Sequence, residues 1–113
     1  MFNFFKKETQ DFYSVRKENV TEYITNGKLE NIYLISPNLG GSTGIDNQIV
    51  VTPKAAEEKK KIDETLINAL AEGKKVTDFK IDMKYKERSI VPSMILIKAS
   101  IDGRKFNKKI RVW

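Results

Sequence analysis

The chain has 113 residues and carries 21 basic and 15 acidic side chains, for a formal net charge of +6. This length indicates a single domain over residues 1–113 with one modest core. The absence of Cys and His excludes disulfides, thiolate metal sites and the side chain that most often serves as a base near neutral pH. No apolar run is long enough for a secretory signal or a membrane span, so we expect a cytoplasmic protein without membrane contact.

The sequence pattern of the N-terminal segment is less specific for one type of secondary structure than that of the remaining chain. Residues 1–10 form a short apolar burst followed by charges and suggest a loosely ordered end. Asp11 to Val15 favours a short strand. Glu18 to Thr25 fits either a helix or a strand, because its apolar residues share a helical face but belong to strand-forming types. Asn26-Gly27 ends this segment.

Two short strands joined by a long loop are predicted next. Leu29 to Ile35 and Ile49 to Val51 are apolar enough for strands. Between them, Ser36 to Asn47 is rich in Gly, Ser, Asn and Pro, which predicts a loop longer than most.

A long helix is predicted to begin after Thr52, with Thr52 as N-cap and Pro53 at the first helical position. Gly73 and the lysines after it supply the stop. One face carries an apolar stripe, and the opposite face should remain in contact with water. The stripe consists of Ile62, Leu66, Ile67 and Leu70, and the exposed face of Glu57, Lys61, Glu64 and Asn68.

After the helix the apolar period changes to that of strands. Residues 79–86 alternate apolar and charged side chains, and a second strand begins at Val91-Pro92. Asp102-Gly103 indicates a two-residue hairpin before a third strand. The predicted fold class is α+β, with a strand–loop–strand–helix unit followed by a three-stranded antiparallel meander that forms one sheet packed on the long helix.

Charge is divided unevenly along the chain. Residues 1–52 hold five basic and six acidic residues, whereas residues 53–113 hold sixteen and nine. A basic half is typical of proteins that bind polyanions, although lysine-rich proteins also carry basic faces that are only solvated. Tyr85 or Trp113 would be available for base stacking. The candidate nucleic-acid-binding side chains on the open sheet face are Lys80, Lys84, Lys86, Lys98, Lys105, Lys109 and Arg111.

The segment from Leu34 to Pro53 reads LISPNLGGSTGIDNQIVVTP, and the predicted helix ends in the run LINALAEGKKV. A lysine-lined strand and the hairpin sequence PSMILIKASIDGRKF follow. In this order the chain resembles the DNA/RNA non-specific endonuclease family, above all the small ββα-metal versions at the ends of bacterial polymorphic toxins. The resemblance covers about residues 29–110. Its most specific parts are Leu34-Ile35 before Gly40-Gly41, then Asn47, then the run from Ala69 to Val76.

The resemblance implies a site with a histidine directly before the Leu-Ile pair, an asparagine early in the helix and a glutamate about two turns later. In that family the histidine deprotonates water, the asparagine holds a magnesium ion, and the glutamate orders the waters of the ion. The corresponding positions here are Tyr33, Ala55 and Asp63. A phenol with a pKa of about 10 is a poor base at pH 7, and alanine offers no ligand. We therefore predict no hydrolytic activity, no cofactor and no metal site, with Asp63 alone able to hold a hydrated magnesium only weakly.

Asn47 is a fourth degenerate position, and several of the residues singled out here also have another interpretation. Tyr33 as a nucleophile on phosphate would need a cluster of arginines, so packing in the strand is favoured. The glycines of the loop would cradle a phosphate, but no Lys-Ser/Thr follows as in a P-loop, which favours an ordinary flexible loop. Asn47 fits turn chemistry better than a site role. Asp63 with Glu64 is also typical of a solvated helix face.

Two hypotheses about function follow. The first is a pseudonuclease, a domain that has kept a nuclease-like fold and binds or regulates a protein partner, such as a nuclease toxin of a toxin–antitoxin system. The second is a nucleic-acid-binding module that uses the basic sheet face. Pairing through the edge of the last strand, which ends at Trp113, would give a homodimer.

Overall fold

The structure is a computed structural model, and it describes residues 12–113. The predicted loose end, residues 1–10, and Asp11 lie outside this range. The described elements confirm an α+β fold with a strand–loop–strand–helix unit followed by a three-stranded meander. In chain order they are helix α2 (Val20–Thr25), strand β1 (Glu30–Tyr33), the 3₁₀ turns η1 (Pro37–Leu39) and η2 (Ile45–Asn47), strand β2 (Gln48–Val51), helix α3 (Pro53–Ala71), and strands β3 (Val76–Tyr85), β4 (Pro92–Ile101) and β5 (Arg104–Arg111).

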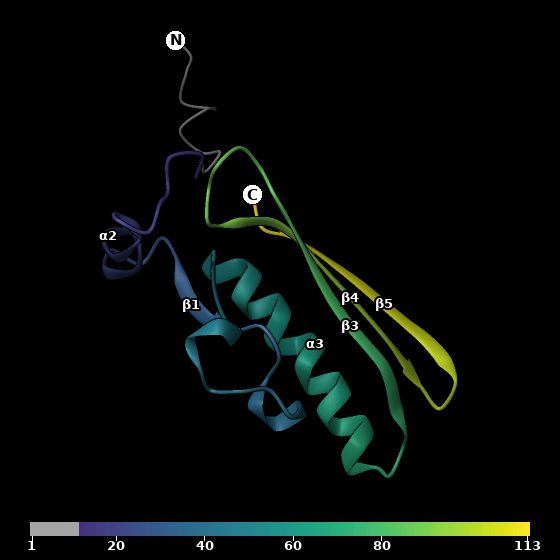
Figure 1. Ribbon diagram of the computed structural model, residues 1–113. Helices are drawn as coiled ribbons and strands as arrows, with labels where there is room; N and C mark the ends of the chain where they lie inside the picture. The colour runs from purple at the N-terminus through teal and green to yellow at the C-terminus, as the bar shows by residue number, and fades with distance from the viewer. Residues whose placement is uncertain (1–11) are drawn as a thin grey trace.

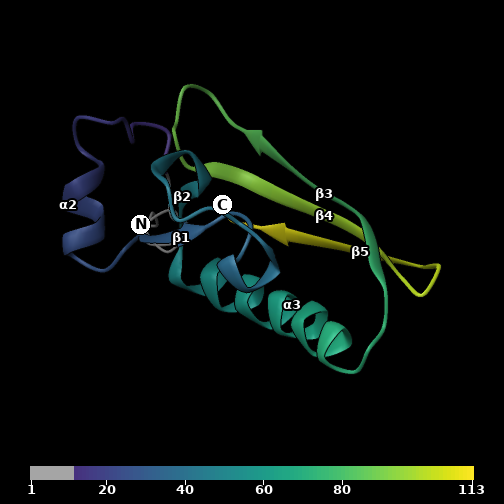
Figure 2. The same ribbon diagram turned by 60° about the horizontal axis from the view of Figure 1, so that its bottom comes forward.

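Helix α3 lies between two antiparallel sheets (Figure 1). The β1–β2 pair and the loop between these strands flank one side of the helix, and the sheet β3-β4-β5 lies along the other side (Figures 1 and 2). The core is shared between these layers: Val51 and Ala55 are buried together with Ile95, Ile97 and Ile110 of the sheet. None of the helices between residues 12 and 113 has the length and apolarity needed to cross a bilayer.

The start of α3 follows the prediction, but its buried face differs in part. Thr52 is the N-cap, because its hydroxyl accepts a hydrogen bond from the Ala55 N–H at 3.2 Å. The helix ends at Ala71, and Gly73 follows with a φ of +83°. The predicted exposed face is exposed. The predicted stripe is wrong at Leu70, which is 44% exposed in the last turn, whereas Ala55, Leu66 and Ala69 are buried.

The N-terminal predictions are partly wrong. Residues 12–15 form a turn, not a strand, closed by a hydrogen bond from the Val15 N–H to the Phe12 carbonyl at 3.2 Å. Phe12 is 1% exposed and makes edge contacts with the rings of Tyr23 and Trp113. Burial of this ring therefore overrides the strand preference of the segment. The undecided segment after it forms helix α2 over Val20–Thr25.

The meander has the predicted strand order and turn. Ile95 of β4 lies opposite Met83 of β3 and Ile110 of β5, so the apolar side chains of the three strands share one face. Asp102 and Gly103 have φ values of 51° and 82°, as a tight hairpin turn requires. Because side chains alternate along a strand, every second residue points to the face away from α3.

Candidate functional site

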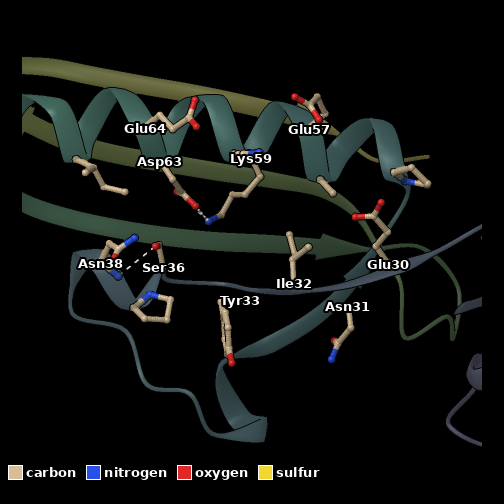
Figure 3. Close-up of a pocket in the computed structure, with 15 residues that line it drawn as sticks. Glu30, Asn31, Ile32, Tyr33, Ser36, Asn38, Glu57, Lys59, Asp63 and Glu64 are labelled. Carbon is tan, nitrogen blue, oxygen red and sulfur yellow. Dashed lines mark hydrogen bonds and ion pairs between the residues drawn. The ribbon is translucent and has the colours of Figure 1, made fainter.

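A pocket of about 560 Å³ lies between strand β1 and helix α3 (Figure 3). Tyr33 of β1 and Ser36 of the loop line one wall, and Lys59, Asp63 and Ile67 of α3 line the other. Two of the predicted degenerate nuclease positions, Tyr33 and Asp63, are thus brought to the same pocket, 30 residues apart in sequence.

The most unusual feature of this pocket is a buried ion pair. The Lys59 ammonium lies 2.9 and 2.8 Å from the two carboxylate oxygens of Asp63, one turn along the helix (Figure 3). The side chains are only 3% and 16% exposed. Both oxygens of the carboxylate are therefore engaged by a cation that belongs to the chain itself.

Burial has a clear effect on the Asp63 carboxyl group. Removal from water disfavours its charged form and raises its pKa above the usual 3.8, while the hydrogen bond and the charge of Lys59 oppose this increase. Burial and Lys59 therefore act in opposite directions on the pKa of this carboxyl group, and burial has the larger effect.

The other predicted positions do not complete a catalytic site. Tyr33 is 37% exposed, and its hydroxyl points away from the Lys59–Asp63 pair (Figure 3). Ala55 is 1% exposed, belongs to the core and does not line the pocket. The Tyr33 hydroxyl and the Asp63 carboxylate therefore do not face one another in the pocket.

The residues of this pocket do not fit a magnesium ion. Magnesium needs oxygen ligands in octahedral geometry, and here the one carboxylate of the predicted trio already contacts an ammonium. A divalent ion beside Asp63 would have to displace Lys59 or tolerate its charge. Within residues 12–113, no group of three or more His, Cys, Asp or Glu side chains could hold a metal.

Asn47 lies outside the pocket and fastens the long loop. Its side-chain oxygen accepts a hydrogen bond from the Ile35 N–H at 2.9 Å. Its amide donates to the carbonyls of Ile35 and Ser42 at 2.8 and 2.6 Å. With 8% exposure, Asn47 satisfies three backbone groups of the loop, which agrees with the turn interpretation.

Gly41 belongs to the same loop contact. A Cβ atom at this position would lie 1.8 Å from the Ile35 carbonyl oxygen. The backbone at Gly41 therefore approaches the Ile35 carbonyl, at the start of the loop after β1, too closely for any side chain, and this glycine has a packing role.

The second candidate region is the face of the β3-β4-β5 sheet that points away from α3. Six of the seven predicted cations lie on it, because the register aligns their positions: Lys80 lies opposite Lys98, and Leu96 lies opposite Lys109. All six are exposed. We call this surface the outer sheet face, and it consists of Thr77, Lys80, Asp82, Lys84, Met94, Leu96, Lys98, Ser100, Lys105, Asn107, Lys109 and Arg111.

The seventh predicted cation and the predicted stacking residues are not part of the outer sheet face. Lys86 donates to the Trp113 carbonyl at 2.9 Å and lies 4.8 Å from the centre of its ring. Trp113 packs edge-on against Phe12 and Tyr13, and its indole N–H donates to the Val91 carbonyl at 3.0 Å. Its prediction as a free stacking residue is wrong, because Phe12 and Tyr13 of the N-terminal turn pack against its ring.

Tyr85 is also misplaced for stacking on the outer sheet face. It is 49% exposed, but its hydroxyl donates to the Met83 sulfur at 3.6 Å. Met83 lies opposite Ile95 on the apolar side of the sheet. The strand alternation therefore directs Tyr85 away from the lysines.

Sequence reasoning missed Lys59, the residue that closes the pocket. In the run EEKKK it resembles a solvated helix face. The signal was present, since the buried stripe through Leu66 and Ile62, continued one turn toward the N-terminus, passes through Lys59 and reaches Ala55. A lysine on that stripe with an aspartate four residues later indicates a buried ion pair.

Comparison with known proteins assigns no family to the chain. Searches with protein-family models and among curated proteins returned no match. Function therefore has to be inferred from the geometry of the pocket and of the outer sheet face.

Proposed function

We propose that this chain is a pseudonuclease, a non-catalytic binding or regulatory protein built on a nuclease-like scaffold. The observation that supports this most strongly is the contact of the Lys59 ammonium with both oxygens of Asp63. In the resembling family this part of the helix serves a magnesium ion. Here a fixed side-chain cation neutralises the carboxylate.

The proton chemistry supports the same proposal. Hydrolysis of a phosphodiester needs a group that accepts a proton from water near neutral pH, and the chain has no histidine. Loss of a general base alone removes about 10²- to 10⁴-fold of rate. Loss of metal assistance, which stabilises charge on the phosphate, compounds this deficit.

The proposed partner is a protein, and a nuclease toxin related to the scaffold is the candidate to test. A chain that has kept the scaffold without the catalytic groups would imitate or block the surface of such a toxin. Where a nuclease toxin is encoded beside this chain, the purified toxin should form a stable complex with it in size-exclusion chromatography, and separate elution would contradict this choice of partner.

Incubation with plasmid DNA and with RNA in Mg²⁺ or Mn²⁺ tests the absence of catalysis. Both substrates should remain intact over hours. The matched control is Asp63→Asn, which removes the only carboxylate of the predicted trio. Clearance by the wild-type protein that disappears in this variant would overturn the pseudonuclease proposal.

A second candidate function is nucleic-acid binding through the outer sheet face. It is favoured by one observation, the gathering of six cations with a single carboxylate on that face. Binding to nucleic acid should then occur at low salt and weaken steeply as salt rises. Absence of binding at low salt would remove this candidate and leave the pseudonuclease proposal intact.

A further inference from the structure

We propose that the outer sheet face binds the phosphate backbone of double-stranded nucleic acid and does not read the bases. This inference rests on the second candidate function and specifies its ligand. It comes from the arrangement of charge, the absence of aromatic side chains on the face, and the spacing of the strands.

The charge of the outer sheet face is strongly one-sided. Asp82, the one carboxylate that the registers place on this face, lies 3.9 Å from Lys80, and the two side chains are 55% and 69% exposed. Asp78 lies in the bulge of β3 at one end of the face, where its carboxylate accepts a hydrogen bond from the Thr77 hydroxyl at 3.4 Å. In the β3–β4 and β4–β5 registers, no other acidic residue falls on this face. Five cations therefore remain without a counter-charge on the face, which suits a polyanionic ligand.

The pairing of Lys80 with Lys98 is unfavourable for the sheet itself. The two residues lie directly opposite each other on adjacent strands. Like charges in this position are destabilising, whereas a face that serves only solubility would intersperse both signs. A bound phosphate between these ammonium groups would convert the repulsion into two attractions.

The apolar residues of the face do not suit single strands. Proteins that bind single strands combine a basic groove with aromatic rings on which successive bases stack. The centre of the outer sheet face holds Met94 and Leu96, both half-buried, and the registers place no aromatic residue on this face. In a duplex the bases are already stacked, so backbone contacts are sufficient.

The spacing of the cations suits two phosphate strands. Lys80 and Lys84 lie on edge strand β3, and Lys105, Lys109 and Arg111 lie on the opposite edge strand β5. With β4 between them, the two lines are separated by about 9.5 Å, which is two inter-strand spacings. This distance falls between the widths of about 6 and 12 Å of the two duplex grooves, so each line of cations can reach one strand.

Fluorescence anisotropy with a 20-base-pair duplex DNA, its isolated strands and a duplex of scrambled sequence tests this inference. With about six phosphate contacts, we expect a slope of log K against log salt close to −5 for the duplex. The two duplexes should bind equally, and each single strand should bind several-fold more weakly.

The double variant Lys98→Glu/Lys109→Glu should weaken duplex binding by more than about tenfold at 50 mM salt and reduce the slope by about two. The matched control is Lys61→Glu/Lys108→Glu, which changes the net charge equally. Lys61 is on the exposed face of α3, and Lys108 lies opposite Ile97 on the other side of the sheet. The control should retain most of the affinity, and circular dichroism should show both variants folded.

Three results would overturn the inference in distinguishable ways. Tighter binding of single strands, or a preference among sequences, would reject duplex-backbone recognition while keeping nucleic-acid binding. Equal losses in the two double variants would reject the outer sheet face as the site. No binding of any probe at low salt would reject the inference together with the second candidate function.

Discussion

The two charged regions of this protein use lysine in opposite ways. In the pocket, Lys59 is 3% exposed and is neutralised by a carboxylate one turn away. On the outer sheet face, Lys80 is 69% exposed and lies opposite another lysine. The first charge is used inside the fold, whereas the second remains available to a ligand.

The difference has consequences for mutation. A buried polar group that loses its partner lowers stability, because it has already lost its contact with water. An exposed cation contributes little to folding, so its removal should instead affect binding. Substitutions in the pocket and its loop should therefore lower the stability of the fold, whereas substitutions on the outer sheet face should lower the affinity for nucleic acid.

The largest effect on stability is expected in the loop beside the pocket. Asn47→Ala removes three hydrogen bonds from a buried side chain, each contributing about 1 kcal/mol, and should lower the free energy of unfolding by about 3 kcal/mol. Asn38→Ala is the control in the same loop, since Asn38 is exposed. Urea unfolding measures both, and similar small losses would show that the loop is not fastened by Asn47.

The buried pair can be broken from one side. Lys59→Met leaves the Asp63 carboxylate without its cation and should cost about 1–3 kcal/mol at pH 7. Lys59→Met/Asp63→Leu removes both charges and should recover the lost stability, because apolar replacements of buried pairs are often neutral or stabilising. A double variant less stable than the single one would contradict the assignment of a purely internal role to Lys59.

Lowering the pH should reduce the loss of stability that Lys59→Met causes. This reduction cannot be larger than the loss of stability at pH 7. Because burial raises the pKa of Asp63 above 3.8, the folded state holds the proton more tightly than the unfolded state. The stabilising contribution of Asp63 protonation is therefore complete below pH 3.8 and is lost as pH rises through the raised pKa. Without Lys59 that pKa rises further, so the stability gap between wild type and variant should narrow as pH falls. A gap independent of pH would contradict this coupling.

The smallest effect on stability should have the opposite sign. Lys98→Glu places a carboxylate opposite Lys80 and should raise the free energy of unfolding by about 0.2–1 kcal/mol, while weakening duplex binding. Thermal unfolding and anisotropy on the same sample measure the two effects. A loss of stability with unchanged binding would show that Lys98 serves the fold and not a ligand, which contradicts the proposed difference between the two regions.

Local signals predicted much of the fold. Thr52 and Pro53 define the start of α3, and Asp102-Gly103 defines the hairpin, because capping and turn chemistry act over a few residues. The alternation along β3 and β4 likewise predicted that Lys80, Lys84 and Lys98 share a face, although Lys86, beyond the end of β3, turns to Trp113 instead. The predicted strand before Val15 was wrong, because the conformation of this segment depends on the burial of Phe12 against Trp113, about 100 residues later in the sequence.

The candidate site divides in the same way. Sequence alone determined that no histidine is present and that the second half of the chain is basic. Only the tertiary structure decided that Lys59 is buried with Asp63, that the Tyr33 hydroxyl turns away, and that Trp113 is covered. The physical reason is that residue types and local spacing fix which groups exist and which face of an element they share, whereas packing between elements fixes which of these groups lose water.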